Sequence, residues 1–321
     1  MTTPQPTTVS IITPSYNQGT FIRETIESVL CQEGDFILDY IIVDGGSTDN
    51  SVEVIRRYES LLAGGDWPVR CRGIRYRWIS EKDHGQADAI VKGFGMAEGE
   101  IRSWLNSDDT LLPGALSRVV ERFLEVPQAG IVYGKVRYVD GEGRAVGEVD
   151  TGPTNYAGLA VLNRICQPGA FFRRSEYDAA GGLDPTLHYV MDHDLWIRMT
   201  LRGEPAFLPE FLASYRLHGE SKTAAPWHAM AFQQETVGIL LRHYARAPLN
   251  RVYACCNARV RSLLPERLPG AAWLSIAPSL LWTMWEYLRL NRGVNVEDLR
   301  MIHPGNLRKI LRGGTVPPTG R

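Results

Sequence analysis

Two adjacent aspartates, Asp108 and Asp109, follow the apolar segment Ile101–Leu105, which has the pattern of a buried strand. Adjacent carboxylates repel each other, so each favours a nearby cation. A hard divalent ion such as Mg²⁺ prefers oxygen ligands and keeps positions open for substrate phosphates. One aspartate could instead cap the helix expected to open at Pro113. Capping explains only one carboxylate, however, and Thr110 could serve as the cap.

Polar and small residues also follow the three preceding apolar segments. Ligands of open α/β sheets bind beyond the carboxyl ends of the strands. Turn formation is the alternative explanation, because Asp, Asn, Gly and Ser dominate turns. Four such segments at one sheet edge favour a binding site over four unrelated turns. These segments are Thr13–Asn17, Asp44–Asp49, Glu81–Asp88 and Asn106–Asp109.

The spacing of apolar residues predicts alternating strands and helices over the first 125 residues. Strands separated by helices of this length pair in parallel with right-handed crossovers. After residue 130, a hairpin signal at Asp140–Gly143 and several short apolar segments predict a mixed extension of the same sheet. The fold class is therefore α/β, with an open, doubly wound sheet. Expected strands are 9–13, 40–43, 74–79, 101–105, 131–139, 145–149, 170–173, 206–208 and 213–217, and expected helices are 20–31, 52–58, 87–96, 113–125 and 192–202.

Composition narrows the class of protein. The chain has 321 residues, of which 44% are hydrophobic and 22% charged, values typical of a globular protein rather than a disordered one. A net charge of −1 argues against nucleic acid as a partner. Five irregularly spaced cysteines argue against a disulfide framework. The first ten residues lack the features of a signal peptide, so we expect a cytoplasmic protein.

Three blocks of this sequence together resemble a known family. They are TPSYNQGTFIRETIESVLCQ, IIVDGGSTDNSVEVIRRY and the NSDD that follows a strand. In order, spacing and context they resemble the inverting family 2 glycosyltransferases of the GT-A fold, over roughly residues 9–220. The resemblance implies a mostly parallel, doubly wound mixed sheet flanked by helices. It also implies a nucleotide-sugar donor, a Mg²⁺ or Mn²⁺ cofactor and a carboxylate base.

The same resemblance assigns roles at the four strand ends. Asp109 would ligate the metal, and Asp108 would face the donor ribose or the metal. Tyr16 would offer an aromatic face to the nucleobase, and Asp44 would accept from the base or ribose. Helix caps and turns are the alternative for most of these positions. The implied donor-binding residues are Thr13, Pro14, Tyr16, Asn17, Asp44, Asp83, Asp88 and Asp108.

A second constellation, Tyr189–Trp196, opens a helix, where one aspartate is expected for capping alone. The resemblance places the catalytic base here, at Asp192. Asp194 is the alternative, because the Asp-His-Asp spacing leaves the register open. Trp196 would pack beneath the acceptor site or act as an ordinary core tryptophan.

Two later elements complete the implied site. His218, within Tyr215–Ser221, would be a metal or phosphate ligand, although a lone histidine is more often structural. Gly169 would lie on the acceptor side and let a ligand approach closely.

The implied reaction is direct transfer of a sugar to an acceptor hydroxyl with inversion, which needs no covalent intermediate. We expect a UDP-sugar donor and a saccharide or lipid-linked acceptor, in cell-surface polysaccharide or glycolipid synthesis. A sugar-phosphate nucleotidyltransferase is one alternative. It needs a glycine-rich loop with a basic residue after the first strand, whereas TPSYNQGTF has one glycine and no lysine. A non-catalytic nucleotide-sugar-binding protein is the other.

From Trp227 onward the sequence pattern is helical, arginine-rich and poor in strands, which divides the chain into a catalytic domain, 1–226, and a basic, mainly helical extension, 227–321. Residues 1–239 carry a net charge of −10 and residues 240–321 a net charge of +9. Residues 268–285 are uncharged and predict an amphipathic helix. That helix would either pack on the body or make peripheral contact with the inner face of a membrane. Its two faces are Trp273, Ile276, Leu280, Met284 and Leu288, and Ser275, Ser279, Thr283 and Glu286.

Overall fold

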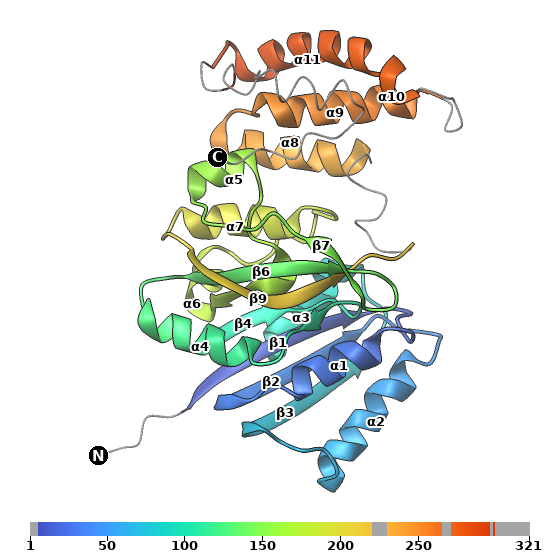
Figure 1. Cartoon of the computed structure of the whole chain (residues 1–321), viewed down its shortest axis with the longest axis vertical. Helices are drawn as coiled ribbons and strands as arrows, with labels where there is room; N and C mark the ends of the chain where they lie inside the picture. Colours follow the sequence, from blue (N-terminus) through green and yellow to red (C-terminus); the bar gives the residue numbers. More distant parts are fainter. Residues whose placement is uncertain (1–5, 220–229, 265–270, 296–297, 299–321) are drawn as a thin grey trace. The chain divides into compact units, whose positions relative to one another are not determined.

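The computed structural model describes residues 6–219, 230–264, 271–295 and 298. The chain divides into two compact units, and Figure 1 follows both along the sequence. Unit 1 comprises residues 1–156 and 164–218, and unit 2 comprises residues 157–163 and 219–321. The boundary predicted between 226 and 227 falls outside the described residues.

Unit 1 is built on a nine-stranded mixed sheet. The predicted α/β class with a doubly wound sheet is confirmed. The runs around 9–13 and 40–43 extend into longer strands whose residues are almost all buried, as expected when helices cover both faces of a parallel sheet. The strands are β1 Thr7–Ser15, β2 Gly34–Asp44, β3 Cys71–Ser80, β4 Ile101–Trp104, β5 Thr110–Leu111, β6 Ile131–Val139, β7 Ala145–Glu148, β8 Ala170–Arg173 and β9 Ala206–Arg216.

The strand order is β3-β2-β1-β4-β8-β6-β9-β5, with β7 paired to β6. β3, β2, β1 and β4 are mutually parallel, β8 runs antiparallel to β4 and β6, and β9 runs parallel to β6. The predicted hairpin is confirmed, because β7 pairs antiparallel with β6. The parallel half therefore brings the carboxyl ends of four strands to one edge.

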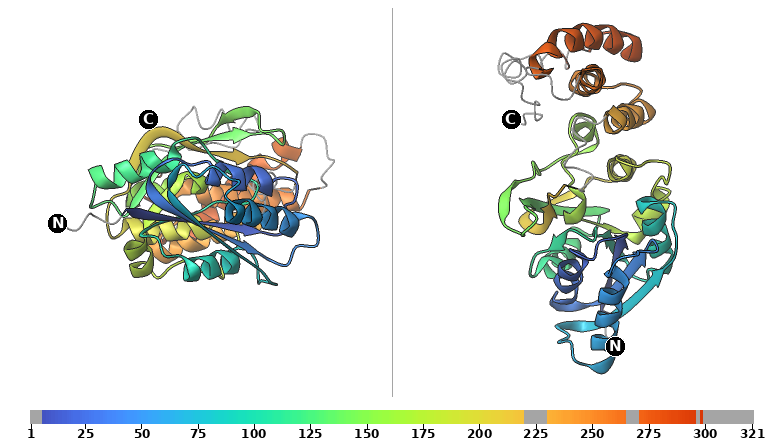
Figure 2. Two further views of the ribbon diagram at one scale, coloured as in Figure 1. Left: turned by 90° about the horizontal axis from the view of Figure 1, so that it is seen from below. Right: turned by 90° about the vertical axis from the view of Figure 1, so that its right-hand side faces the viewer.

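Helices cover both faces of the sheet, as the views in Figure 2 show. The apolar faces of α1, α2 and α4 share one core cluster with β1, β2 and β6. On the opposite face, aromatic rings of α3, α6 and α7 pack against those of β4 and β8. The helices of unit 1 are α1 Ile22–Leu30, α2 Ser51–Gly64, α3 Gln86–Met96, α4 Ala115–Glu125, α6 Arg174–Ala179 and α7 Met191–Thr200, with a 3₁₀ turn at Gln167–Gly169.

Gly93 lies in the interior of α3, where glycine lowers the stability of a helix. The packing of α3 on β1 explains why a glycine is present at this position. A Cβ at Gly93 would lie 2.4 Å from the Ile12 side chain. The glycine therefore lets α3 lie directly against β1, which holds the start of α3 close to the carboxyl edge of the sheet.

The two strands predicted at 206–208 and 213–217 are wrong as separate elements, because they form one strand, β9. The register between β6 and β9 shifts twice, beside Lys135. Pro209 falls in this irregular stretch, and proline is tolerated in strands at such places. The short strand β5, which pairs with β9, was not expected from the sequence.

Unit 2 contains the short helix α5 Tyr156–Val161 and four later helices. α9 packs against both α8 and α11 (Figure 1). The Nε of Arg251 and the Nδ2 of Asn250, on α9, donate to the Val161 carbonyl at 3.0 and 3.3 Å, which ties α5 to this layer. The later helices are α8 Met230–Tyr244, α9 Leu249–Ser262, α10 Ala271–Leu274 and α11 Ile276–Asn291. No helix in the described part of the chain is long and apolar enough to cross a bilayer.

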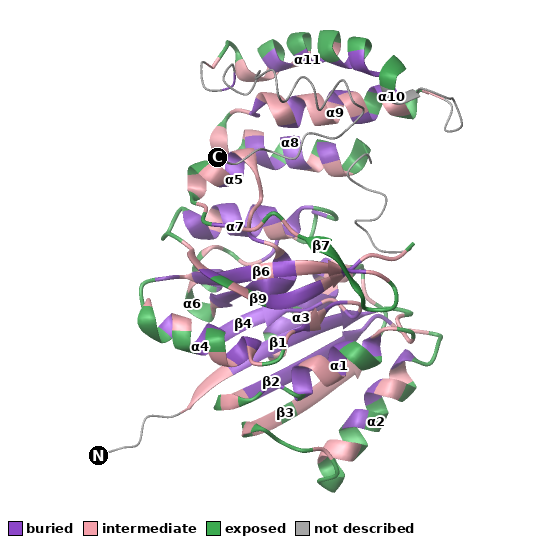
Figure 3. Cartoon of the chain, in the orientation of Figure 1, coloured by how far each residue is buried: buried purple, intermediate pink, exposed green. Residues whose placement is uncertain are grey.

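The two faces predicted for the amphipathic helix do not separate into one buried and one exposed side. On the predicted apolar face Leu280, Met284 and Leu288 are exposed but Ile276 is buried, and on the other face Ser279 and Thr283 are buried. Figure 3 shows the exposed and buried sides of α11.

Candidate active site

The loops after β1 and β2 are tied together by hydrogen bonds between side chains and backbone. The Asn17 amide nitrogen donates to the Ser47 hydroxyl at 2.8 Å, and the Asn17 side-chain oxygen accepts from the Thr48 amide at 2.9 Å. The Gly19 amide donates to an Asp49 carboxylate oxygen at 2.8 Å. Asn17 adopts a left-handed conformation, with φ of 51°, which asparagine tolerates better than most residues. The two loops therefore form one braced platform.

Of the four residues predicted from the first strand end, only two expose their side chains. Tyr16 is 59% exposed, and Asn17 is exposed beside it. Thr13 and Pro14 are buried, and the Thr13 hydroxyl lies 3.1 Å from the Tyr40 hydroxyl. The Thr13 and Pro14 side chains therefore face the protein interior, and the part of this pair in donor binding stays a prediction.

Asp44 lies at the end of β2 but is fully buried. One of its carboxylate oxygens accepts from the Gly46 and Ser47 amides at 3.1 and 2.9 Å and from the Ser80 hydroxyl at 2.7 Å. The carboxylate thus stabilises the turn that presents the platform. The predicted contact of Asp44 with a base or ribose would need an exposed carboxylate, whereas this side chain is buried.

Asp83 and Asp88 come from the segment between β3 and α3. A Cβ on Gly45 would lie 2.6 Å from an Asp83 carboxylate oxygen, so Asp83 lies against the platform. Asp88 accepts from the His84 amide at 3.0 Å and pairs with Lys92 at 3.3 Å. The His84 amide is the main reason why the pKa of Asp88 lies below its usual range. Asp88 therefore supports the first turn of α3.

Asp109 is buried at the centre of this edge. One of its carboxylate oxygens accepts from the Arg216 backbone amide at 3.0 Å, and the Thr25 hydroxyl donates to its carbonyl at 2.8 Å. Burial, followed by the neighbouring charge of Asp108, raises the pKa of Asp109 well above its usual range. A cation bound nearby would add to the positive charge of Arg216 and lower the pKa of Asp109.

Asp108 is partly exposed and faces His218, the residue predicted from the end of β9. The His218 Nε2 lies 3.0 Å from an Asp108 carboxylate oxygen. The imidazole packs against the Phe21 ring, with centroids 4.6 Å apart. The structure therefore joins residues 110 positions apart in sequence. Glu220 and Ser221, from the same predicted constellation, lie outside the described residues.

Arg216 organises this pair, although the sequence pattern assigned it no role. Its buried guanidinium donates from Nε to the Asp108 carbonyl at 3.0 Å and from Nη1 to the Gly141 carbonyl at 2.9 Å. The same group pairs with Glu24 and lies 5.0 Å from the centre of the Phe21 ring. One side chain thus connects β9 to α1, to the hairpin and to the paired aspartates. The sequence signal that could have identified Arg216 is its position two residues before His218, at the end of a strand.

The donor set is compatible with a divalent cation. No group of three or more His, Cys, Asp or Glu side chains within the described ranges is arranged to hold a metal ion. As they lie, Asp108, Asp109 and His218 do not form a complete metal site, but they offer carboxylate oxygens and one imidazole nitrogen. Burial and the charge of Asp108 disfavour the ionised form of Asp109. This fits a metal that takes its remaining ligands from substrate phosphates.

The two candidate bases on α7 have different surroundings. Asp194 is buried and pairs with Arg198 at 2.8 Å, whereas Asp192 is half-buried. Burial first, and then the charges of Asp109 and Asp192, raise the pKa of the Cys166 thiol well above its usual range. Asp192 and Asp109 therefore lie within electrostatic reach of the same thiol. Cys166 was not expected near the site from the sequence.

The two residues predicted on the acceptor side, Gly169 and Trp196, both lie in packed surroundings. A Cβ on Gly169 would lie 2.7 Å from a methyl group of Val136, so the glycine makes room for the protein itself rather than for a ligand. Trp196 is fully buried and stacks on Trp104 at 5.7 Å between centroids. This burial fits both predictions for Trp196, as a residue beneath the acceptor site and as an ordinary core tryptophan.

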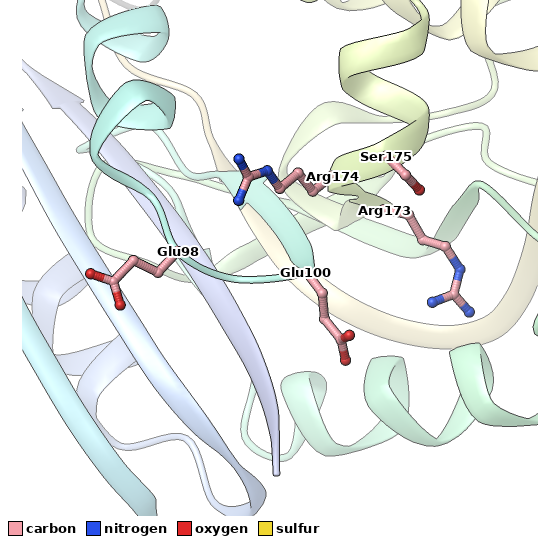
Figure 4. A pocket seen from close by; sticks show the side chains of 5 residues that line it. All are labelled: Glu98, Glu100, Arg173, Arg174 and Ser175. Atoms are coloured by element: carbon pink, nitrogen blue, oxygen red, sulfur yellow. The ribbon is translucent and has the colours of Figure 1, made fainter. Parts of the chain in front are cut away.

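A separate charged pocket lies at the other end of the parallel strands (Figure 4). It has a volume of about 350 Å³ and is lined by Glu98, Glu100, Arg173, Arg174 and Ser175. Because these residues lie at the start of β4 and the end of β8, the pocket is distinct from the candidate site.

Comparison with known sequences gives a family. The model of a family described as glycosyl transferase family 2 matches residues 10–179, more than half of the chain. An uncharacterized glycosyltransferase of Nostoc sp. is 29% identical over 236 residues, which cover 70% of each chain. A chondroitin synthase of Escherichia coli is 23% identical over 253 residues, 77% of this chain but only 35% of that protein.

Comparison with solved structures supports the fold. Residues 1–349 of Staphylococcus aureus TarS, in complex with UDP-GlcNAc, match with a TM-score of 0.55 and 15% identity, over 88% of this chain and 90% of that one. The mannosyltransferase PcManGT of Pyrobaculum calidifontis, in complex with GDP-Man and Mn²⁺, matches with a TM-score of 0.54 and 19% identity, over 92% and 88%.

Proposed function

The chain belongs to glycosyl transferase family 2, and from that premise we propose that it is a metal-dependent inverting enzyme that uses a UDP-sugar donor. The observation that carries the proposal is the cluster that follows β4, where Asp108 and Asp109 are braced by Arg216 and His218. The neighbouring parallel strand β1 ends at the same sheet edge, and its loop carries the exposed Tyr16. A donor diphosphate needs such a place beside its nucleobase site. The family membership removes the nucleotidyltransferase alternative.

Donor binding is assigned to the platform and the aspartates. Tyr16 stacks on the nucleobase, and Asn17 and Asp83 flank it. Asp109, Asp108 and His218 would hold a Mg²⁺ or Mn²⁺ ion, which would supply positive charge to the leaving diphosphate. Support comes from the TarS complex with UDP-GlcNAc and the PcManGT complex with GDP-Man and Mn²⁺.

Transfer is assigned to Asp192 as the general base. Its carboxylate takes the proton from the acceptor hydroxyl as that oxygen attacks the anomeric carbon, and the nucleoside diphosphate leaves from the opposite face. Such a base contributes roughly 10²–10⁴-fold to the rate. Asp192 is preferred to Asp194 because the Asp194 carboxylate is buried in its pair with Arg198.

The acceptor is a saccharide or a lipid-linked saccharide, in polysaccharide or glycolipid synthesis. The relative named chondroitin synthase supports this class. The match covers about a third of that relative's length.

The test combines donor binding with transfer for two matched variants. Calorimetry with UDP- and GDP-sugars, with Mn²⁺ and with EDTA, identifies the donor, which is then used with a panel of saccharide acceptors. We expect Asp192→Asn to keep donor affinity and lose transfer by at least about 10²-fold. Asp194→Asn is expected to lower the melting temperature and to affect transfer less. Normal transfer by Asp192→Asn together with collapse in Asp194→Asn would move the base to Asp194, and normal transfer by both would remove this segment from the mechanism.

A further inference from the structure

The helix α11 in unit 2 carries large apolar side chains on its outward side as well as on its inward side. Its outward side, with that of α10, carries a set of large exposed apolar residues that we name the outer face. Leu281 is 69% exposed and Trp285 61% exposed. Figure 3 shows this side of α11 as exposed. The outer face consists of Trp273, Leu274, Leu280, Leu281, Met284, Trp285 and Leu288.

The side of α11 that packs inward combines polar and apolar residues. Ile276 and Tyr287 are buried, and Trp282 and Leu290 pack against the apolar cluster that contains Tyr287. Ser279 and Thr283 are buried, and the Ser279 hydroxyl lies 3.2 Å from the Asn257 side-chain oxygen on α9. The Thr283 hydroxyl donates to the Ser279 carbonyl at 2.6 Å. Helices in water bury their apolar stripe. Helices in lipid pack through small and hydroxyl residues, because lipid covers their apolar side.

Basic side chains lie next to the outer face. The Arg289 guanidinium lies 5.7 Å from the Trp285 ring and pairs with Glu286 on the same helix. The Arg259 guanidinium lies 5.2 Å from the centre of the Trp282 ring, which is outside the outer face. Arg292, at the end of α11, is exposed. Residues 240–321 carry a net charge of +9. Paired arginine and tryptophan side chains suit the boundary between lipid headgroups and acyl chains.

The length of α11 decides how it would meet a bilayer. Sixteen residues make a helix of roughly 24 Å. The hydrocarbon core is about 30 Å thick. The helix is therefore too short to span and suits the plane of the interface, where an amphipathic helix inserts its apolar side.

We propose that the outer face of α10 and α11 is a docking surface for an anionic lipid bilayer. The helix lies in the plane of the membrane, with Leu281, Met284 and Trp285 inserted and Arg259, Arg289 and Arg292 at the phosphate level. A second copy of the chain is the weaker occupant, because it would bring two strongly basic segments together.

The experiment is co-sedimentation of the full chain with vesicles of phosphatidylcholine, with and without phosphatidylglycerol. The test variant is Leu281→Glu combined with Trp285→Glu. The matched control is Leu124→Glu on α4, where the native leucine is 72% exposed. We expect binding to the anionic vesicles, a loss of at least about tenfold in the double variant, and no change in the control. Melting temperature and donor affinity should stay unchanged in all three proteins, because the substituted side chains face outward.

Three results would overturn the proposal. The first is a wild-type chain that ignores anionic vesicles or binds neutral ones equally well. The second is a double variant that binds like the wild type while deletion of residues 299–321 abolishes binding, which would assign the lipid contact to that segment. The third is a wild-type dimer in size-exclusion chromatography that the double variant dissociates, which would make a second copy the occupant.

Discussion

Replacement of Arg216 by methionine tests whether one buried side chain holds the paired aspartates in place. Methionine keeps much of the side-chain volume and removes the charged guanidinium group. The Arg216 backbone amide, which donates to Asp109, remains in the variant. The change therefore separates the bracing of the Asp108 backbone from the hydrogen bond made to the Asp109 side chain.

The expected cost follows from the bonds that are lost. Two charge-assisted hydrogen bonds, to the carbonyls of Asp108 at 3.0 Å and Gly141 at 2.9 Å, contribute roughly 1.5–3 kcal/mol each. The Glu24 side chain is 56% exposed, so its ion pair adds at most about 1 kcal/mol. Relief of the desolvation of the guanidinium offsets part of the loss. We expect a net loss of about 2–4 kcal/mol in the free energy of unfolding.

The assay is thermal unfolding followed by calorimetry with UDP and Mn²⁺. At about 2–4 °C per kcal/mol for a unit of this size, the melting temperature of Arg216→Met should fall by roughly 5–15 °C. Metal-dependent UDP affinity should fall as well, measured at a temperature where the variant is folded. Glu24→Gln is the matched control, and it should cost no more than about 1 kcal/mol. An Arg216→Met protein that melts and binds UDP like the wild type would refute the bracing role. A Glu24→Gln variant that costs as much as Arg216→Met would place the stabilisation in the ion pair instead.

Three further changes test the rest of the site. Asp109→Asn keeps the acceptor for the Arg216 amide but removes the charge, so UDP binding should become insensitive to Mn²⁺; equal binding by wild type in Mn²⁺ and in EDTA would disprove the metal assignment. Tyr16→Ala should weaken UDP binding by about 1–3 kcal/mol, the usual range for a base stacked on an aromatic ring, with an unchanged melting temperature; unchanged affinity would take Tyr16 out of the nucleobase site. Gly169→Ala forces a methyl group against Val136 and should cost about 1–3 kcal/mol of stability; a melting temperature at or above that of the wild type would show that Val136 moves aside without cost.

The alternation of strands and helices could be predicted because both faces of a parallel strand are covered. Ile11 and Ile12, neighbours in β1, are both fully buried, and such continuous apolar runs stand out in a sequence. β9 could not be predicted as one strand, because its register on β6 shifts where Pro209 interrupts the pattern. The local sequence around Pro209 does not reveal that β6 can pair with β9 across a shift in register.

The candidate site was predictable in place but not in the direction of each side chain. Thr13 and Asp44 fall at strand ends, where ligands bind, yet both side chains are turned into the protein. Whether a residue at a strand end faces the ligand or the turn depends on the neighbouring strand, as the hydrogen bond from Ser80 to Asp44 shows. The ion pair of Arg216 with Glu24 joins residues 192 positions apart, a separation over which a sequence pattern carries no signal.

The same reasoning applies to α11, where the sequence periodicity predicts two faces but does not tell which residues turn inward. Ile276 of the predicted apolar face is buried together with Ser279 and Thr283. An apolar stripe and a stripe of serine and threonine can each form a helix contact, the first by excluding water and the second by letting two backbones approach closely. α9 offers Cys256 and Asn257 at the contact, and these small or polar residues match Ser279 and Thr283 better than they match Trp285. The polar part of the inward side therefore matches α9, while Trp282 and Tyr287 of α11 pack in the apolar cluster with Val252. Leu281, Met284 and Trp285 find no place in that contact and stay exposed, which is the basis of the proposed lipid contact.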